Sequence, residues 1–503
     1  MGAPTELVNG ITAELKILFA ASEALPLIKT GGLADVAGSL PEALVERGLD
    51  VRVVLPAYRG LKERFDRLDE LALLHIPRLV EPVRVLSGRL DDTQPPYVLV
   101  DAPTLFERDG GPYADAAGLD HPDNAQRFAA FARVIVALAL GHGGDGWRPD
   151  LVHTNDWQTA LVPALLARER QRPGNVFTIH NLAYQGVFGQ ATFLDLDLPA
   201  DLWSMHGLEF HGNLSFIKGG IAYADAVTAV SPTYAKQICT PELGYGLQDL
   251  LSYRGERLFG VLNGIDTTLW DPASDPAIPH KYDADNLAAK SGNKRALQET
   301  FGLPVRDDVL LFGHVGRLVE QKGVDLIIEL LPWMLEEQDL QLVVLGSGHA
   351  HLQAALETAA ASHPGRLGIV IGYDESLSHL IEAGADCFLM PSRFEPCGLN
   401  QMYSQRYGTL PLVHRTGGLA DTVIDATGDN LLAGTATGFV FDQPNVAGLR
   451  SALQRVIDFN RRPRAWWEKV QQTGMAQDFS WTASARRYID IYRYALEHPV
   501  SIP

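Results

Sequence analysis

The chain has 503 residues, of which 46% are hydrophobic and 20% charged, and this composition excludes intrinsic disorder, collagen-like repeats and a disulfide scaffold. Its length predicts two or three globular domains. Because 61 acidic residues outnumber 42 Lys and Arg, the net charge of −19 argues against general binding to nucleic acid or anionic membranes.

Short apolar runs alternate with amphipathic stretches along most of the chain. In the first half they predict buried strands at Lys16–Ala20, Asp50–Leu55, Tyr97–Val100, Asp150–His153, Val176–His180 and Ala226–Val230. In the second half they predict strands at Val309–Phe312, Gln341–Leu345, Gly368–Ile371, Asp386–Met390 and Leu410–Val413. Near-continuous apolar strands separated by helices are typical of parallel sheets covered on both faces, so we expect two doubly wound α/β domains.

The polar segment at residues 252–257 marks the expected boundary between these domains. We therefore expect one domain over residues 1–254 and a second over 255–478. Apolar residues at helical spacing predict a separate amphipathic helix within 479–503, and that helix needs a partner surface.

The cysteine content and the N-terminal sequence indicate in which cellular compartment the protein resides. Cys239, Cys387 and Cys397 have neither the number for a disulfide framework nor the spacing of a zinc site, which suits a reducing cytosol. Charged residues interrupt the apolar N-terminal segment, and no uncharged stretch reaches the ~20 residues that cross a bilayer. We expect a cytoplasmic protein without a membrane anchor.

One hexapeptide occurs twice, as Thr30-Gly-Gly-Leu-Ala-Asp35 and as Thr416-Gly-Gly-Leu-Ala-Asp421. Each copy follows a basic residue, Lys29 or Arg415, and lies between a predicted strand and a predicted helix. Paired glycines let the backbone approach an anion, and free N–H groups at a helix start favour negative charge. We expect the two loops to bind one phosphorylated ligand in a shared cleft. The alternative is two unrelated tight turns.

Further charged residues follow the strands of the second half. Arg317 and Lys322 come after the first of these strands and are suited to clamp a diphosphate, although a solvated basic turn is the alternative. Glu395 follows the strand ending at Met390, where ligands of open α/β sheets bind, and can accept hydrogen bonds from sugar hydroxyls or cap a helix. Cys397 has no neighbouring His, and we interpret it as a packed thiol.

Polar residues also follow two strands of the first half. Asp156 can bond a hydroxylated ligand, Trp157 can offer its ring to a sugar, and His180 can donate to a hydroxyl or phosphate oxygen. A capping Asp, a core Trp and a backbone-bonded His are the alternatives. The position of these residues favours the functional interpretation, because all these motifs lie at the carboxyl ends of strands.

Taken together, these segments resemble bacterial glycogen synthases, the retaining glucosyltransferases related to plant starch synthases. The likeness covers about residues 16–495 and rests on Lys29-Thr-Gly-Gly-Leu33, His180-Asn-Leu-Ala-Tyr-Gln-Gly186, Asn263-Gly-Ile-Asp266, Arg317 with Lys322-Gly323, and Arg393-Phe-Glu-Pro-Cys-Gly-Leu399. Many relatives in the wider class carry a second glutamate eight positions after the first. Tyr403 stands there in this chain, as in glycogen synthases.

The resemblance implies the GT-B architecture, two Rossmann-like domains facing a deep cleft, with the C-terminal helix crossing back to the first domain. It implies transfer of glucose from ADP-glucose to the nonreducing 4-hydroxyl of an α-1,4-glucan, with retention and with neither cofactor nor metal. The implied catalytic residues are Glu395, His180, Asp156, Arg317 and Lys322. The implied donor-binding residues are Lys29, Gly31, Gly32, Asn263, Tyr373, Thr416, Gly417, Gly418 and Leu419.

Three other classes of protein are the alternatives. A glucan phosphorylase of similar architecture would need a pyridoxal phosphate lysine, for which no motif is present. An NAD-dependent dehydrogenase would need Gly-x-Gly-x-x-Gly, which Gly346-Ser-Gly348 does not complete. A non-catalytic sugar-binding protein would not need Arg317 and Lys322 facing a diphosphate. The residues alone do not distinguish ADP-glucose from UDP-glucose, and they leave oligomeric state and regulation open.

Overall fold

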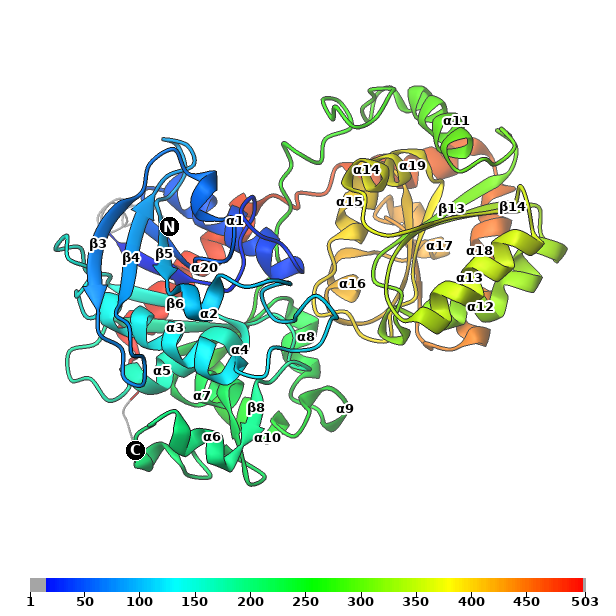
Figure 1. Ribbon diagram of the computed structural model, residues 1–503. Coiled ribbons are helices and arrows are strands. Elements are labelled where there is room, and N and C mark those ends of the chain that lie inside the picture. The colour runs from blue at the N-terminus through cyan, green and yellow to red at the C-terminus, as the bar shows by residue number, and fades with distance from the viewer. Residues whose placement is uncertain (1–14, 501–503) are drawn as a thin grey trace, which may run out of the picture. The chain divides into compact units, whose positions relative to one another are not determined.

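The computed structural model describes residues 15–500, which form two compact units (Figure 1). The first unit comprises the described residues up to Gly264 together with those from Trp481 onward, and the second comprises Ile265–Ser480. No helix within residues 15–500 is long and apolar enough to cross a membrane.

The first unit contains a nine-stranded sheet with the order β12-β11-β7-β6-β1-β2-β5-β4-β3. Its strands pair in parallel from β12 to β5, whereas β4 and β3 form an antiparallel edge. The strands are β1 (Lys16–Ala20), β2 (Asp50–Pro56), β3 (Asp69–Leu74), β4 (Val83–Gly88), β5 (Tyr97–Asp101), β6 (Leu151–Asn155), β7 (Gly174–Ile179), β11 (Ala226–Ala229) and β12 (Leu258–Gly260). A small antiparallel sheet holds β8 (Val187–Gly189), β10 (Asn213–Ser215) and β9 (Glu209–Phe210).

The helices of the first unit cover its sheet, and the last of them comes from the far end of the chain. Figure 1 shows α20 in red beside α1 in blue, and α20 packs on both α1 and β7. His153 on β6 bonds Tyr492 of α20 through Nδ1 at 2.8 Å. The helices are α1 (Gly32–Val45), α2 (Pro103–Phe106), α3 (Asn124–Ala139), α4 (Asp156–Thr159), α5 (Leu161–Leu166), α6 (Gln190–Asp195), α7 (Phe216–Tyr223), α8 (Pro232–Gln237), α9 (Pro241–Gly244), α10 (Gln248–Arg254) and α20 (Trp481–Glu497).

The second unit contains a parallel six-stranded sheet with the order β15-β14-β13-β16-β17-β18. Successive strand residues enter different cores: Leu310 and Phe312 belong to one buried cluster and Leu311 to the other. Both faces are therefore covered, which explains the uninterrupted apolar runs. The strands are β13 (Leu310–Val315), β14 (Leu340–Gly346), β15 (Leu367–Ile371), β16 (Cys387–Met390), β17 (Leu410–His414) and β18 (Phe439–Phe441).

Helices of the second unit contribute buried side chains to each of these two cores. One cluster includes residues of α12, α13, α18 and α19, and the other includes residues of α11, α14 and α16. The helices are α11 (Lys290–Thr300), α12 (Val324–Pro332), α13 (Ala350–Ser362), α14 (Glu375–Gly384), α15 (Asn400–Arg406), α16 (Gly417–Thr422), α17 (Gly428–Ala433), α18 (Val446–Asn460) and α19 (Arg464–Met475).

Three features differ from the sequence expectation. The first unit runs past the expected boundary at residue 254 to Gly264, because β12 pairs in parallel with β11 and so extends the first sheet. The segment expected to begin at residue 479 joins the first unit at Trp481. The antiparallel β3–β4 edge was not predicted, since its residues are largely exposed and lack a continuous apolar run.

Candidate functional site

A cation and a carboxylate meet at the carboxyl ends of β13 and β16, which are neighbouring strands of the second unit. Lys322 Nζ donates to Glu395 Oε2 at 2.5 Å, and Ser392 Oγ donates to the same oxygen at 3.1 Å. The Glu395 residue is only 6% exposed. The sequence pattern therefore placed Lys322 and Glu395 correctly beside strand ends, and the fold brings them into contact.

Backbone contacts hold the two loops that carry this pair. Gly323 has φ +72°, and a Cβ on it would lie 2.2 Å from the carbonyl oxygen of Pro391, so glycine is required for the loops to meet. Arg393 N donates to the carbonyl oxygen of Gln321 at 2.8 Å. The Arg393 guanidinium bonds both carboxylate oxygens of Asp325, at 2.6 and 2.7 Å. This bidentate pair fixes the loop that carries Lys322 to the loop that carries Glu395.

The other two expected residues on this edge of the sheet are open to solvent. Arg317 follows β13 and is exposed, with Nη2 donating to Gln321 Oε1 at 3.4 Å. Tyr373 follows β15, is 76% exposed, and donates its hydroxyl hydrogen to Glu375. Both side chains are accessible to a soluble ligand.

The second glycine loop is packed tightly against the loop that carries Glu395. A Cβ on Gly417 (φ +43°) would lie 1.9 Å from the carbonyl oxygen of Glu395, and one on Gly418 would lie 2.1 Å from that of Cys397. Gly418 N donates to the carbonyl oxygens of Glu395 and Pro396, each at 3.2 Å. The expectation of a free N–H at Gly418 is therefore wrong. These glycines permit loop packing, while Thr416 and Leu419 beside them are buried.

The first glycine loop already contacts a carboxylate of its own chain. Glu23, 3% exposed, accepts hydrogen bonds from Thr30 N, from Thr30 Oγ1 at 2.5 Å and from Gly31 N at 3.2 Å. Burial raises the pKa of this carboxyl above its usual value, against the opposite effect of these hydrogen bonds. The expectation of free amides is thus wrong for Thr30 and Gly31. Sequence reasoning missed Glu23 because its partners lie seven and eight residues further on.

Packing does not explain the paired glycines of this first copy. A Cβ on Gly31 would lie no closer than 3.8 Å to another atom, and one on Gly32 would meet nothing within 4 Å. Lys29 Nζ lies 2.9 Å from Asp35 Oδ1, and the lysine side chain is about one-third exposed. The two copies of the hexapeptide therefore differ, because only the second needs its glycines for internal packing.

Asp156 and His180 lie together at the ends of β6 and β7. Asp156 has φ +55°, which strains a non-glycine residue, and its Oδ1 accepts from His180 N at 2.8 Å and from Asn181 N at 3.4 Å. Burial raises the pKa of Asp156 to about 7. A strained backbone and a perturbed carboxyl at a strand end are features of a functional site.

The His180 ring is neutral and has a defined tautomer. Burial lowers its pKa to about 3. Asn155 Nδ2 donates to the carbonyl oxygen of Ala20 at 3.0 Å, which orients Oδ1 toward His180 Nε2, also at 3.0 Å. Nε2 therefore carries the proton and Nδ1 is an acceptor. The expectation that His180 donates to a ligand needs correction, because its donor hydrogen is used by Asn155.

Two aromatic residues pack against other rings, the half-buried Trp157 and the buried Tyr403. The Trp157 ring packs edge-on against Phe128, with centroids 5.0 Å apart, and lies near Phe188 and Phe216. The structure thus favours the core interpretation of Trp157. Tyr403, eight residues after Glu395, stacks on Trp270 at 3.8 Å. Cys397 is 5% exposed, as expected of a packed thiol.

Two buried acceptor atoms lie near the carboxyl ends of strands and have no hydrogen-bond partner within the described residues. Asn263 is 5% exposed, and its Oδ1 has no hydrogen-bond partner within the described residues. His314, at the end of β13, bonds the carbonyl oxygen of Leu389 through Nδ1 at 2.9 Å, while its buried Nε2 has no such partner in residues 15–500. Burial lowers the pKa of His314 to about 4, so Nε2 is an acceptor. Sequence reasoning missed His314, since a lone strand histidine carries no motif.

Comparison with known proteins adds independent findings. Residues 16–253 match the family model described as starch synthase catalytic domain, and residues 297–473 match glycosyl transferases group 1. The chain is 51% identical to glycogen synthase 2 of Nitrosococcus oceani, covering 97% of this chain and 98% of that protein. It is 53% identical to glycogen synthase 1 of Methylococcus capsulatus, covering 96% and 97%.

Solved structures agree with these sequence matches. The catalytic domain of starch synthase IV from Arabidopsis thaliana, bound to ADP and acarbose, superposes with a TM-score of 0.87 at 32% identity, covering 96% of this chain and 99% of that one. Sucrose-phosphate synthase from Thermosynechococcus elongatus shares the fold at 18% identity, with a TM-score of 0.59. These matches favour a glycosyltransferase over the phosphorylase, dehydrogenase and sugar-binding alternatives.

Proposed function

Because the chain belongs to the glycogen synthase family, we propose that it transfers glucose from ADP-glucose to the nonreducing 4-hydroxyl of an α-1,4-glucan, with retention of configuration. It is a hexosyltransferase with the two-domain GT-B fold. Family membership supports a nucleotide-sugar donor and a glucan acceptor. The preference for ADP rests on the likeness to bacterial and plant relatives, and we propose the cytoplasm as its compartment.

The contact between Lys322 and Glu395 is the observation that carries this proposal. Loss of ADP from the anomeric carbon develops negative charge on the β-phosphate and positive charge on the sugar ring. Lys322, together with the exposed Arg317, supplies positive charge for the phosphate. Glu395 accepts hydrogen bonds from the glucosyl hydroxyls and is held by Ser392. These side chains supply charge to both parts of the donor, and we propose that no metal is required.

Residues of the first unit are proposed to contact the glucosyl group and the diphosphate. His180 accepts a hydrogen bond from a sugar hydroxyl at Nδ1, because Asn155 holds Nε2. Asn263 offers its buried Oδ1 to the donor. Lys29 and the amides beside Gly31 and Gly32 bind phosphate oxygens, and the open space around Gly32 supports this role. Phosphate binding at Gly31 N requires release of Glu23.

The nucleotide end of the donor is assigned to the second unit. Tyr373 is proposed to lie at the base, and its exposed ring is available for stacking. The loop Thr416-Gly417-Gly418-Leu419 is proposed to lie beside the diphosphate. Since Gly418 N is used in packing on Glu395 and Pro396, this loop acts by positioning Glu395 more than through free amides.

For retention we propose that departure and attack take place on the same face of the sugar. The bond from the anomeric carbon to the β-phosphate oxygen breaks, a bond to the acceptor 4-oxygen forms, and the leaving phosphate takes the 4-hydroxyl proton. No enzyme carboxylate then bonds to the sugar, in contrast to a double displacement. A trapped glucosyl adduct on Asp156 or Glu395, found by mass spectrometry of the intact protein, would overturn this mechanism.

The experiment that tests the function is incorporation of labelled glucose into glycogen from ADP-glucose and from UDP-glucose in parallel. We expect incorporation from ADP-glucose, unchanged by a chelator, and a much slower reaction from UDP-glucose. NMR of the product should show new α-1,4 linkages. Faster transfer from UDP-glucose would contradict the donor assignment, and β-linked product would contradict retention.

A further inference from the structure

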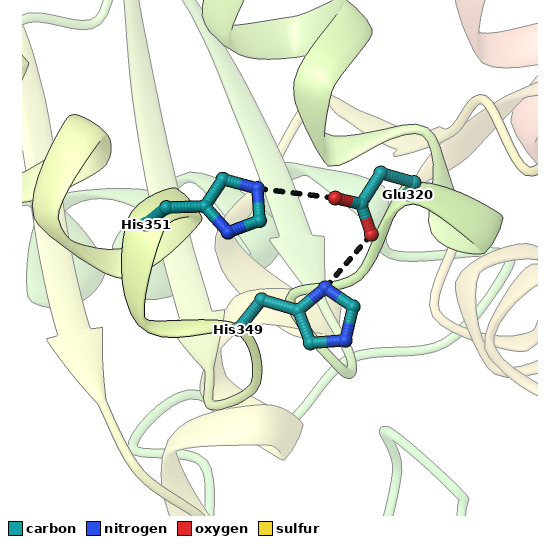
Figure 2. A group of neighbouring side chains, drawn as sticks. All are labelled: Glu320, His349 and His351. Carbon is teal, nitrogen blue, oxygen red and sulfur yellow. Dashed lines mark ion pairs between the residues drawn. The ribbon is translucent and has the colours of Figure 1, made fainter.

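Three side chains of metal-ligating type converge in the second unit, one from the turn that also carries Lys322 and two from the start of α13. Figure 2 shows the imidazoles of His349 and His351 directed at the two carboxylate oxygens of Glu320. His349 Nδ1 lies 2.8 Å from Oε2, and His351 Nε2 lies 3.0 Å from Oε1. One ligand atom from each residue falls within 4.8 Å of the others, and within residues 15–500 no other group of three meets this criterion.

Backbone hydrogen bonds join the two segments that carry these three side chains. Glu320 lies in a single turn of 3₁₀ helix over Glu320–Lys322, and His349 immediately precedes α13. Leu318 N donates to the carbonyl oxygen of Ser347, and His349 N donates to that of Leu318, both at 2.9 Å. These bonds join the two segments as a short parallel bridge. The fold therefore holds the two segments side by side, which lowers the cost of bringing their ligand atoms onto one ion.

The chemistry of the set suits a divalent transition metal. Two imidazoles and a carboxylate are ligands of Zn²⁺ and related ions, with water filling the remaining positions. Ligand atoms about 2 Å from a tetrahedral zinc lie roughly 3.3 Å from one another, so only small movements of these side chains are needed. The side chains of Glu320, His349 and His351 are 46%, 53% and 66% exposed, which leaves the group open to an ion from solution.

The ordinary alternative is a pair of weak surface hydrogen bonds. One such pair exists elsewhere in this unit, where His363 Nε2 lies 3.1 Å from Glu336 Oε1. The group at Glu320 differs from it because two imidazoles share one carboxylate.

We propose that Glu320, His349 and His351 form a binding site for one divalent transition-metal ion such as Zn²⁺. His349 Nδ1, His351 Nε2 and the Glu320 carboxylate are its protein ligands. The ion ties the segment carrying Glu320, two residues before Lys322, to the start of α13. This site takes no part in the bond-breaking step, and its existence does not depend on the proposed glucosyl transfer.

Calorimetric titration of the metal-stripped full chain with zinc chloride tests the site. We expect one ion per chain, with affinity lowered at least about tenfold by each of His349→Ala, His351→Ala and Glu320→Gln, since weaker outer-shell changes already cost 10–100-fold. His363→Ala is the matched control because it removes a His–Glu contact of similar length without touching the group. It should bind zinc as the wild type does.

A second measurement distinguishes loss of the metal site from misfolding of the variants. Cobalt(II) bound to the wild-type chain should give visible absorption bands of a low-coordinate site, and the double variant H349A/H351A should lose them while keeping the wild-type melting temperature. The proposal is overturned if the wild-type chain binds no zinc. It is equally overturned if the three ligand variants bind zinc as tightly as His363→Ala does.

Discussion

Asn155 Oδ1 accepts a hydrogen bond from His180 Nε2 at 3.0 Å, and the Asn155 amide is itself oriented by the carbonyl oxygen of Ala20. This contact reverses the role that sequence reasoning assigned to His180. A histidine at a strand end suggests a donor to substrate. In the folded chain its hydrogen points at Asn155, and Nδ1 is left to accept.

The tautomer can be observed directly. In the ¹⁵N–¹H correlation spectrum of chain labelled at histidine, the His180 ring should remain neutral down to about pH 5 and carry its proton on Nε2, because burial lowers its pKa to about 3. His180→Ala identifies the signals. A ring protonated on Nδ1, or one that titrates near pH 6.5, would contradict the assignment.

The two hexapeptides offer a matched pair of glycine substitutions. Gly418→Ala should destabilise the second unit by about 1–3 kcal/mol or more, because its Cβ would lie 2.1 Å from the Cys397 carbonyl oxygen. Gly32→Ala should leave the melting temperature unchanged, since nothing lies within 4 Å. If Gly32 contacts the donor as proposed, its variant should still lose at least about tenfold in kcat/KM, or 1.4 kcal/mol. A stable, fully active Gly32→Ala would remove Gly32 from the donor site.

Lys322→Ala should lower kcat by about 100-fold or more while changing KM less, because its charge is proposed to stabilise the departing phosphate. Steady-state kinetics with ADP-glucose checks this. The substitution also removes the cation beside the buried carboxylate of Glu395, which within the described residues keeps only Ser392 as a partner, so stability needs a control. Lys62→Ala is the control, because Lys62 pairs at 3.1 Å with Asp101, a carboxylate that is 2% exposed and likewise keeps a second partner, Arg84. Equal loss of activity in both variants would point to instability in place of catalysis.

Strand positions were predictable because parallel strands are buried on both faces. Leu342 and Val344 enter one core of the second unit and Val343 the other, which leaves an unbroken apolar run in the sequence. The β3–β4 edge gave no such signal, since one face meets water and Leu73 is 52% exposed. The strands that could be predicted are therefore those whose two faces are both buried.

Site residues were predictable by type and by place, but their bonding was not. Lys322 and Glu395 lie where their strand-end positions indicated. In contrast, the roles of Glu23, Asn155 and His314 depend on partners 7 to 75 positions away. Such pairings come from the fold and carry no local sequence signal. The same holds for the group at Glu320, whose histidines lie on a different segment.

Activity should rise with pH through about 7 if the ionised form of Asp156 is needed to support His180. Burial raises the pKa of Asp156 to about 7, so the carboxylate fraction grows between pH 6 and 8. The measurement is kcat/KM against pH for the wild type and for Asp156→Asn. The variant should be less active and should lack this rise. A wild-type profile that is flat from pH 6 to 8 would contradict a role for the carboxylate.

The stability of the second unit should fall as pH rises through about 9, because the histidine of a buried His379–Asp275 ion pair loses its charge there. His379 stacks on Trp270 at 3.7 Å, and its Nδ1 lies 2.7 Å from Asp275 Oδ2. Burial opposes its charge, but the hydrogen bond to Asp275 and the nearby Glu375 carboxylate outweigh this and raise the pKa of His379 to about 9. A raised histidine pKa stabilises the fold fully below about pH 6.5, and this contribution is lost as pH passes the folded value.

The loss should be on the order of 2–3 kcal/mol between pH 7 and 10, measured by denaturant unfolding monitored through tryptophan fluorescence. Glu382 and Lys290 also have shifted pKa values, of about 8 and about 7, and burial is the main cause for each. The informative quantity is therefore the difference between the wild type and His379→Gln, in which their contributions largely cancel. Tyr407, which donates to Asp275 at 2.6 Å, stays in place in both chains. Parallel stability curves for the two chains from pH 7 to 10 would show that His379 is not charged in the folded state.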